Sequence, residues 1–364
     1  MIATTIAGDE LVLSGWSAAS AFGLGADRFA DGVRAGTDAV APLDRAAWPG
    51  PYDRAGLIPG FDIPELLGRK GTRSMDRATG IAIATVGMLL DQCGPELVGE
   101  PERIGLVLGT SSGSVQSIMD FTRESLTGAR PFHVDPARFP NTVMNRAAGQ
   151  SAIWYGLKGP NTTIAGGSLT GLLALNYAVR LQRGGHSDLI LCGAVEEYSV
   201  QRGWLEWHGR EGVAAPLGEG CAIFLLEPLS SAVRDGRRPL ATVRGSRFRA
   251  FSDPAAVRPV LGRCIGDALG AAGLRPEDVR VVAASDAGNG LAAAEEAAIA
   301  DVLGANRPTR LHCRALLGDT SSASSAFQLA AALSELSDRS DGVALVTGVD
   351  RDGQVGATLL GAVS

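Results

Sequence analysis

The sequence predicts a layered α/β fold, because short runs of Val, Ile and Leu alternate along the chain with alanine-rich stretches of helical length. The apolar runs have no polar face, which is typical of strands buried in a sheet that helices cover on both sides. These runs occupy residues 11–14, 104–109, 189–193, 222–226, 281–284 and 343–347. The alanine-rich stretches occupy residues 76–93, 170–182, 257–272, 295–303 and 324–336. We therefore expect strands and helices to alternate from one end of the chain to the other.

The chain also repeats its own pattern. A helix, a strand, a glycine turn and a second strand follow one another from Leu169, and the same order returns from Ser322. In both copies a Ser-Asp pair stands just ahead of the first strand. Self-similarity of this length predicts two homologous halves. We assign them to residues 1–235 and 236–364, with the boundary in a charged, proline-containing stretch.

Composition excludes several classes of protein. Of the 364 residues, 45% are hydrophobic and 20% charged, which is ordinary for a protein with a buried core. The net charge of −6 gives no reason to expect nucleic acid or an anionic membrane as a partner. The five cysteines form no C-x-x-C pair, so the sequence predicts neither a disulfide framework nor a zinc site.

The sequence contains no targeting or membrane signal that we can identify. The first residues lack the basic segment of a signal peptide, and no stretch approaches the roughly 20 apolar residues that span a membrane. No G-x-x-x-x-G-K-[ST] string for nucleotide phosphates occurs. We therefore expect a cytoplasmic protein that needs no metal or cofactor.

Several strings in chain order resemble the β-ketoacyl synthase (ketosynthase) branch of the thiolase fold. They are LVLSGWSAASAFGLG from residue 11, RSMDRATGIAIATV from residue 73, IGLVLGTSSG from residue 104, NRAAGQSAIWYGLKGPN from residue 145 and PLGEGCAIFLLEP from residue 216. The resemblance implies two pseudo-duplicated βαβαβαββ halves in an αβαβα layered sandwich.

The resemblance also implies where catalytic residues would lie. Family members use a cysteine at a helix N-terminus, where the helix dipole lowers the thiol pKa and backbone N–H groups stabilise an oxyanion. They also use two histidines. This chain carries Ser168 at the cysteine position, with the helix starting there, and Asp286 and Asp319 near the two histidine positions. Arg351 and Gly353 fall in the segment that replaces the glycine-rich gating loop of the family.

The resemblance thus implies a site without the Cys-His-His triad, and each substitute residue has two interpretations. Ser168 is either a nucleophile for acyl transfer or a serine that caps its helix. Asp319 would be a poor base for Ser168, because a carboxylate of ordinary pKa accepts a hydroxyl proton weakly. Asp286 and Asp319 are paired carboxylates with one raised pKa, or mark a site that has lost its catalytic role, or pair with Arg314 and Arg351.

Residues 114–128 predict an amphipathic helix that carries four residues on one face: Val115, Ile118, Met119 and Thr122. These residues either pack in the core or, as the resemblance implies, line an acyl tunnel at a dimer interface. The segment 139–145 matches one that reaches towards the partner's active site in ketosynthase dimers. Its residues Pro140, Asn141, Thr142 and Val143 suit a solvated loop and an interface loop equally well.

Three functional hypotheses follow from the resemblance. The first is a chain-length-factor subunit of a type II polyketide synthase, which forms a heterodimer with an active ketosynthase and shapes the tunnel for the acyl chain carried by an acyl carrier protein. Such a subunit has no condensing activity by itself. The second is a stand-alone acyltransferase that uses Ser168 to form an ester or amide. The third is a structural homologue with neither tunnel nor acyl-carrier contact.

Overall fold

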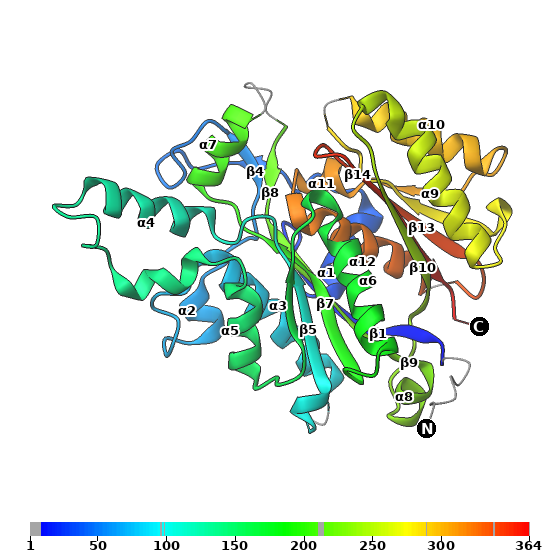
Figure 1. Cartoon of the computed structure of the whole chain (residues 1–364), viewed down its shortest axis with the longest axis horizontal. Helices are drawn as coiled ribbons and strands as arrows, with labels where there is room; N and C mark the ends of the chain where they lie inside the picture. Colours follow the sequence, from blue (N-terminus) through cyan, green and yellow to red (C-terminus); the bar gives the residue numbers. More distant parts are fainter. Residues whose placement is uncertain are drawn as a thin grey trace.

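The main sheet of the molecule consists of two five-stranded sections (Figure 1). The computed structural model describes residues 9–94, 97, 99–209, 215–288, 290–337 and 339–363. In the first section the strands lie in the order β6 (Asn161–Ile164), β5 (Ile104–Gly109), β7 (Leu189–Glu196), β9 (Gly220–Pro228) and β1 (Leu11–Ser20). In the second they lie in the order β12 (Thr309–Leu311), β11 (Val279–Ala283), β13 (Val343–Asp350), β14 (Gln354–Gly361) and β10 (Ala241–Ala250).

The two sections have the same internal arrangement. In each, the three strands at the outer end are parallel, while the last two run antiparallel to their neighbours. The sections meet only where β1 pairs with β10, through Val12 with Thr242 and Leu13 with Ala241. All six predicted strands are present, because runs that are apolar on both faces are stable only where helices cover both faces.

The helices between the strands also correspond in the two halves. The first half has α3 (Arg77–Cys93), α5 (Arg146–Tyr155) and α6 (Thr170–Arg183), and the second has α9 (Val257–Ala271), α10 (Leu291–Leu303) and α12 (Ser324–Leu336). With the strands, these helices confirm the predicted βαβαβαββ order of each half. The boundary that we expected after residue 235 lies in the turn between α8 (Leu229–Arg234) and β10.

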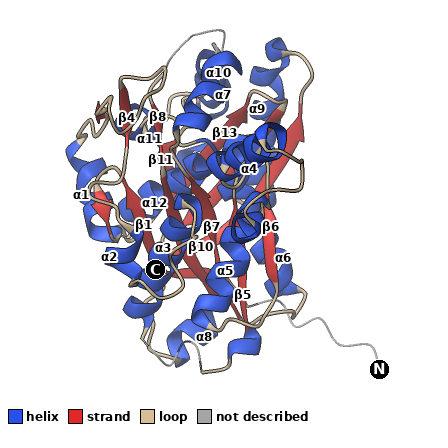
Figure 2. Cartoon of the chain, turned by 90° about the vertical axis from the view of Figure 1, so that its left-hand side faces the viewer, coloured by secondary structure: helices blue, strands red, loops and turns tan. Residues whose placement is uncertain are grey.

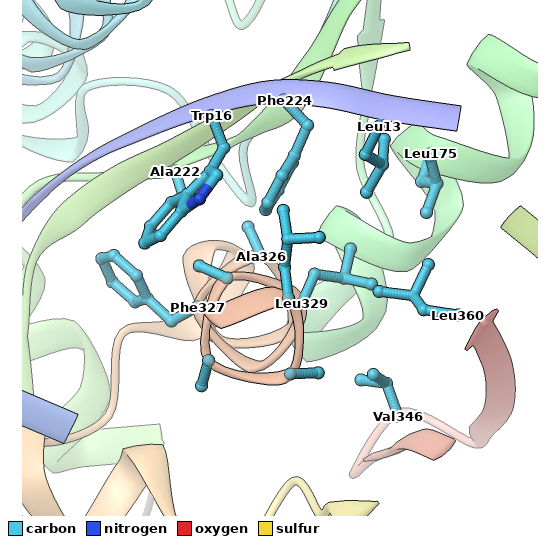
Figure 3. Packing of buried hydrophobic residues seen from close by; sticks show 14 of the residues in the cluster. Leu13, Trp16, Leu175, Ala222, Phe224, Ala326, Phe327, Leu329, Val346 and Leu360 are labelled. Atoms are coloured by element: carbon cyan, nitrogen blue, oxygen red, sulfur yellow. The ribbon is translucent and has the colours of Figure 1, made fainter. Parts of the chain in front are cut away.

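The elements stack in five layers, as expected. Helices α6 and α12 lie between the two sheet sections, α3 and α5 cover the outer face of the first section, and α9 and α10 cover that of the second (Figures 1 and 2). Helix α12 is buried along almost its whole length, because it has a sheet on each side. Figure 3 shows Leu329 of α12 between Phe224 of β9 and Leu360 of β14, while Phe327 of the same helix faces Trp16 of β1.

The two central helices are in close contact at a glycine of α6. A methyl group on Gly171 would lie 2.4 Å from the backbone nitrogen of Ala326 and 2.8 Å from its Cα atom. We therefore expect Gly171→Ala to lower the free energy of unfolding by roughly 1–3 kcal/mol, measured as a shift of the urea midpoint, because backbone atoms of α12 must move.

Gly149→Ala in α5 is the matched control, since a methyl group there meets nothing within 4 Å. Alanine is the better helix former by about 1 kcal/mol, so this variant is expected to be as stable as the unmodified protein or more stable. Equal destabilisation by both substitutions would contradict the close-contact explanation.

The remaining elements surround the layered core. They include α1 (Ala26–Ala35), α2 (Ile63–Leu67), α4 (Val115–Thr127), α7 (Val200–Gly209), α11 (Cys313–Leu317), a 3₁₀ segment at Pro136–Thr142, the short strand β2 (Gly23–Leu24) beside β1, and a small sheet of β3 (Ala41–Pro42), β4 (Arg54–Gly56) and β8 (Leu217–Gly218). Helix α4 projects from the body at the left of Figure 1. Within the described ranges, no helix is both long and apolar enough to cross a membrane.

Candidate functional site

A cavity of about 400 Å³ lies where segments from both halves of the chain meet. Loops that follow the parallel strands β5, β11 and β13 contribute to it, as do the segments that lead into α6 and α12, together with α7. The carboxyl ends of parallel strands share one edge of a sheet, and this is where α/β proteins usually place their sites. The lining residues are Ser111, Ser112, Gly167, Ser168, Leu205, Glu206, Gly209, Ser285, Ala287, Gly288, Leu291, Arg314, Asp319, Ser321, Ser324, Val349, Asp350, Arg351 and Asp352.

Ser168 lies in a 3₁₀ turn, Gly167–Leu169, directly before α6. Its backbone N–H donates a hydrogen bond to Oδ2 of Asp350 at 2.7 Å, and its hydroxyl donates to the same oxygen at 3.0 Å. The hydroxyl also lies 3.2 Å from the carbonyl oxygen of Val349. The serine therefore does not cap α6, for which no side-chain cap is formed, and its use as a nucleophile stays a prediction.

Asp350 is the main residue of the site that sequence reasoning missed. It ends β13 and is 7% exposed, and its Oδ1 accepts the N–H of Asp352 at 2.9 Å. An aspartate that accepts the N–H two residues on is typical of a turn. The Asp-x-Asp-Gly string after a buried strand could have indicated this turn, but we selected its neighbours Arg351 and Gly353.

Those two neighbours have separate roles in the structure. Arg351 lines the cavity and forms an ion pair with Glu206 of α7 at 3.5 Å. Gly353 does not line the cavity. It has φ +98°, a conformation that favours glycine, and a methyl group there would lie 2.5 Å from the carbonyl oxygen of Phe251.

The two aspartates near the family's histidine positions have different partners. Asp319 lines the cavity, accepts a hydrogen bond from Arg314 at 2.8 Å, and also accepts the N–H of Ser321 at 2.9 Å. Asp286 is absent from the lining. Its backbone has φ +49°, and its carboxylate lies 3.0 Å from Nδ1 of His312. The ion-pair interpretation is therefore right for Asp319 with Arg314, whereas Asp286 pairs with His312, a contact that we did not predict.

Among the residues that the structure describes, neither cysteine nor histidine lines this cavity. Cys192 and Cys313 are buried, and desolvation raises the pKa of each thiol to about 12. A thiol with such a pKa is almost fully protonated at neutral pH and is a weak nucleophile. The described part of the lining thus offers Ser168 and carboxylates, without a thiolate or an imidazole.

The predicted face of α4 is only partly buried. Val115 is buried and Ile118 half-buried, but Met119 is 40% exposed and Thr122 is exposed as well. Core packing within this chain is therefore a wrong interpretation for Met119 and Thr122. Their place in an acyl tunnel stays a prediction.

Residues 115–144, which we call the arm, expose an unusual number of large apolar side chains. Exposed fractions are 80% for Leu126, 68% for Phe132, 58% for Phe139, 41% for Val143, 40% for Met119 and 39% for Met144. Phe139 packs against Phe121 of α4 with ring centroids 6.0 Å apart. Apolar groups gathered on one projection are typical of a protein-binding surface.

A second cavity, of about 800 Å³, lies where the arm joins the body. Asn141 lines it, is 6% exposed and donates a hydrogen bond to the carbonyl oxygen of Ser74. Pro140 and Val143 are exposed and Thr142 is half-buried, so the segment 139–145 is anchored by Asn141 and otherwise faces solvent. Val115, Ile118, Met119 and Thr122 do not line this cavity.

A buried carboxylate links the arm to the body. Oε1 of Glu197 accepts the Ser114 hydroxyl at 3.1 Å and the Gln116 N–H at 3.3 Å, while Oε2 accepts the Ala78 N–H of α3 at 3.3 Å. Desolvation, with repulsion from Asp76, raises the pKa of Glu197 to about 8. The folded protein therefore holds this proton more tightly than the unfolded chain does.

The raised pKa of Glu197 predicts a pH dependence of stability. The contribution of Glu197 is fully present below its ordinary pKa of 4.5 and is lost as the pH rises through about 8. Glu197→Gln mimics the protonated side chain, so we expect its stability relative to the unmodified protein to increase between pH 5.5 and pH 8.5. Urea midpoints at both pH values measure this, with Glu65→Gln on the exposed surface of α2 as control. A relative stability that does not change with pH would contradict the assignment.

Comparisons with known proteins agree with this architecture. The family model described as β-ketoacyl synthase, N-terminal domain, matches residues 9–232. The solved structure described as the ishigamide ketosynthase/chain length factor has a TM-score of 0.89 and 40% sequence identity, covering 98% of this chain and 100% of that chain. A β-ketoacyl synthase structure from Burkholderia phymatum has a TM-score of 0.85 at 20% identity and supports the fold alone.

Curated relatives match shorter parts. The tetracenomycin polyketide synthase ketoacyl synthase alpha subunit of Streptomyces glaucescens is 30% identical over 278 residues, 66% of this chain and 63% of the relative. The 3-oxoacyl-[acyl-carrier-protein] synthase 2 of Vibrio cholerae is 28% identical over 211 residues, 52% of this chain and 51% of the relative. The present chain thus matches about half the length of that synthase.

Proposed function

The chain belongs to the β-ketoacyl synthase family, and from that premise we propose that it is the non-catalytic chain-length-factor subunit of a type II polyketide or polyene synthase. It pairs with an active ketosynthase subunit in the cytoplasm. Together they form the tunnel that holds the growing acyl chain, which an acyl carrier protein delivers. The similarity to the ishigamide ketosynthase/chain length factor supports both the role and the kind of partner.

The observation that carries the non-catalytic role is the hydrogen bonding of Ser168. Its N–H and its hydroxyl both donate to Oδ2 of Asp350, and the described lining of the cavity holds no Cys or His. Acyl transfer requires a nucleophile with an available base and free donors for the oxyanion. At this position both donors of Ser168 are already engaged.

The arm and the adjoining sheet edge support the heterodimer. The arm exposes Phe132 and Phe139, and the edge strand β6 lies at the end of the same sheet section. An unpaired strand edge and exposed aromatic side chains are each favourable surfaces for association with another chain. We infer that the ketosynthase subunit covers it.

One contact favours a second candidate, a serine acyltransferase. The Asp350 carboxylate lies 3.0 Å from the Ser168 hydroxyl, which is within reach for a general base. In that mechanism the hydroxyl oxygen would attack a thioester carbonyl, Asp350 would take the hydroxyl proton, and the pantetheine thiol would leave. The Ser168 N–H would then have to leave Asp350 to stabilise the oxyanion, which makes this candidate the weaker one.

Intact-protein mass spectrometry distinguishes the two candidates. The chain is incubated with an acyl-loaded carrier protein, alone and together with its candidate ketosynthase. A non-catalytic subunit stays unmodified while the ketosynthase gains the acyl group and requires this chain to extend it. An acyl adduct on this chain that disappears in Ser168→Ala would overturn the proposal and identify a serine acyltransferase.

A further inference from the structure

We propose that Asp350 occupies the place of an acyl oxyanion, so that the chain blocks its own nucleophile position from within. The inference rests on the proposed non-catalytic role and adds the device that enforces it. A serine in place of cysteine would weaken the nucleophile, whereas the Asp350 carboxylate also removes the electrostatic support that any nucleophile at this position would need.

The Asp350 carboxylate is held by donors on both of its oxygens. Oδ2 accepts the N–H of Ser168 at 2.7 Å and its hydroxyl at 3.0 Å, and Oδ1 accepts the N–H of Asp352 at 2.9 Å. The residue is 7% exposed and stands at the end of β13, where a hairpin turn fixes its backbone. A carboxylate with this many fixed donors has little freedom to move away.

The turn before α6 is shaped to receive this carboxylate. Gly167 has φ +54°, and a methyl group there would lie 2.0 Å from Oδ2 of Asp350. The β13–β14 hairpin lies close to the same turn. Methyl groups on Gly348 of β13 and Gly356 of β14 would lie 3.0 Å and 2.9 Å from the side chain of Leu169. Three glycines from separate segments thus leave room for the hairpin and its carboxylate.

The chemical consequence follows from charge. A thioester under attack develops negative charge on its carbonyl oxygen, and a backbone N–H at the nucleophile is a usual donor to it. In this chain a carboxylate already accepts the N–H of Ser168 and would repel a second anion at short range. The loss of one such donor typically lowers kcat by about 10²–10³-fold.

The contact with Asp350 is also expected to change the thiolate fraction of a cysteine placed at position 168. In Ser168→Cys the neighbouring carboxylate disfavours the thiolate, since like charges repel. In Ser168→Cys/Asp350→Ala the thiol regains a free helix N-terminus, which favours the thiolate. The proposal therefore predicts that removal of Asp350 speeds alkylation of Cys at position 168.

The experiment compares alkylation rates by iodoacetamide, in which the thiolate sulfur displaces iodide and the thiol proton goes to the buffer. Peptide mass spectrometry separates the peptide that contains position 168 from those that contain Cys93 and the four buried cysteines. Only alkylation of the new thiol is therefore measured. We expect the double variant to react at least about tenfold faster at pH 7, with the midpoint of its pH profile at least about one pH unit lower.

Ser168→Cys/Asp352→Ala is the matched control. Asp352 belongs to the same turn and lines the same cavity, but only its backbone N–H contacts Asp350. This variant is expected to react at the rate of Ser168→Cys. Equal rates for all three variants, or equal acceleration by Asp352→Ala, would overturn the proposal.

Small carboxylates provide a second readout. Acetate or formate is expected to slow alkylation of Ser168→Cys/Asp350→Ala, because removal of the Asp350 carboxylate leaves room for an anion at the N–H of position 168. In Ser168→Cys that room is still filled by Asp350, so the alkylation rate is expected not to change. If Asp350→Ala lowers the melting temperature too far, Ser168→Cys/Asp350→Asn removes the charge alone and must still accelerate alkylation. None of these measurements uses a partner subunit, so their failure overturns the blocking role of Asp350 and leaves the proposed function to its own test.

Discussion

Phe139→Asp is expected to abolish assembly with the ketosynthase subunit while the monomer stays folded. Phe139 is 58% exposed and contacts Phe121 of α4, so its replacement removes little of the chain's own core. In the proposed heterodimer it is one of the exposed apolar side chains of the arm that the partner covers. Truncation of such a residue commonly costs about 2 kcal/mol or more of binding free energy, and a buried carboxylate adds a desolvation cost.

Val233→Asp is the control for this prediction. Val233 is 65% exposed on α8, which lies at the bottom of Figure 1, away from α4 at the left. Analytical ultracentrifugation of each variant with the ketosynthase subunit measures assembly, and circular dichroism checks the fold. If Phe139→Asp binds as tightly as Val233→Asp, the arm is not the interface.

The sequence predicted the layered core well because its signals are local. A strand such as β5 is apolar on both faces, and this pattern arises only where helices cover both sides of a sheet. The internal repeat then required the second half to follow the first, and the matching strand order of the two sections confirms it.

The site was less predictable because its contacts join distant parts of the chain. Ser168 and Asp350 are 182 residues apart, and their hydrogen bonds depend on where the β13–β14 turn meets the start of α6. The resemblance pointed to Arg351 at the gating-loop position, although the adjacent Asp350 is the residue that holds the serine. The positive φ of Asp286 and the contact of its carboxylate with His312 leave no signal in a single sequence.

Periodicity had a similar limit on α4. The spacing of Val115, Ile118, Met119 and Thr122 correctly indicated a helix with one distinct face. It could not indicate whether that face packs within the same chain or contacts a partner chain. The burial of each side chain decides this for the single chain: of the four residues, only Val115 is buried.

Thr122→Trp, and separately Met119→Trp, are expected to shorten the product by at least one extension unit. Both side chains are exposed in the single chain, so a larger group fits without disturbing the fold. In the proposed heterodimer they face the tunnel, where added volume collides with the end of an acyl chain that would otherwise be extended again. Product length, measured by mass spectrometry of the carrier-bound acyl chain, reads this out directly.

Thr127→Trp on the same helix is the matched control, because Thr127 is also exposed but lies well away from the face that carries Thr122. It is expected to leave the product unchanged. Unchanged products from Thr122→Trp and Met119→Trp, in a heterodimer that still forms, would remove this face of α4 from the tunnel. Shorter products from all three would instead indicate that the arm, and not a specific face of α4, limits extension.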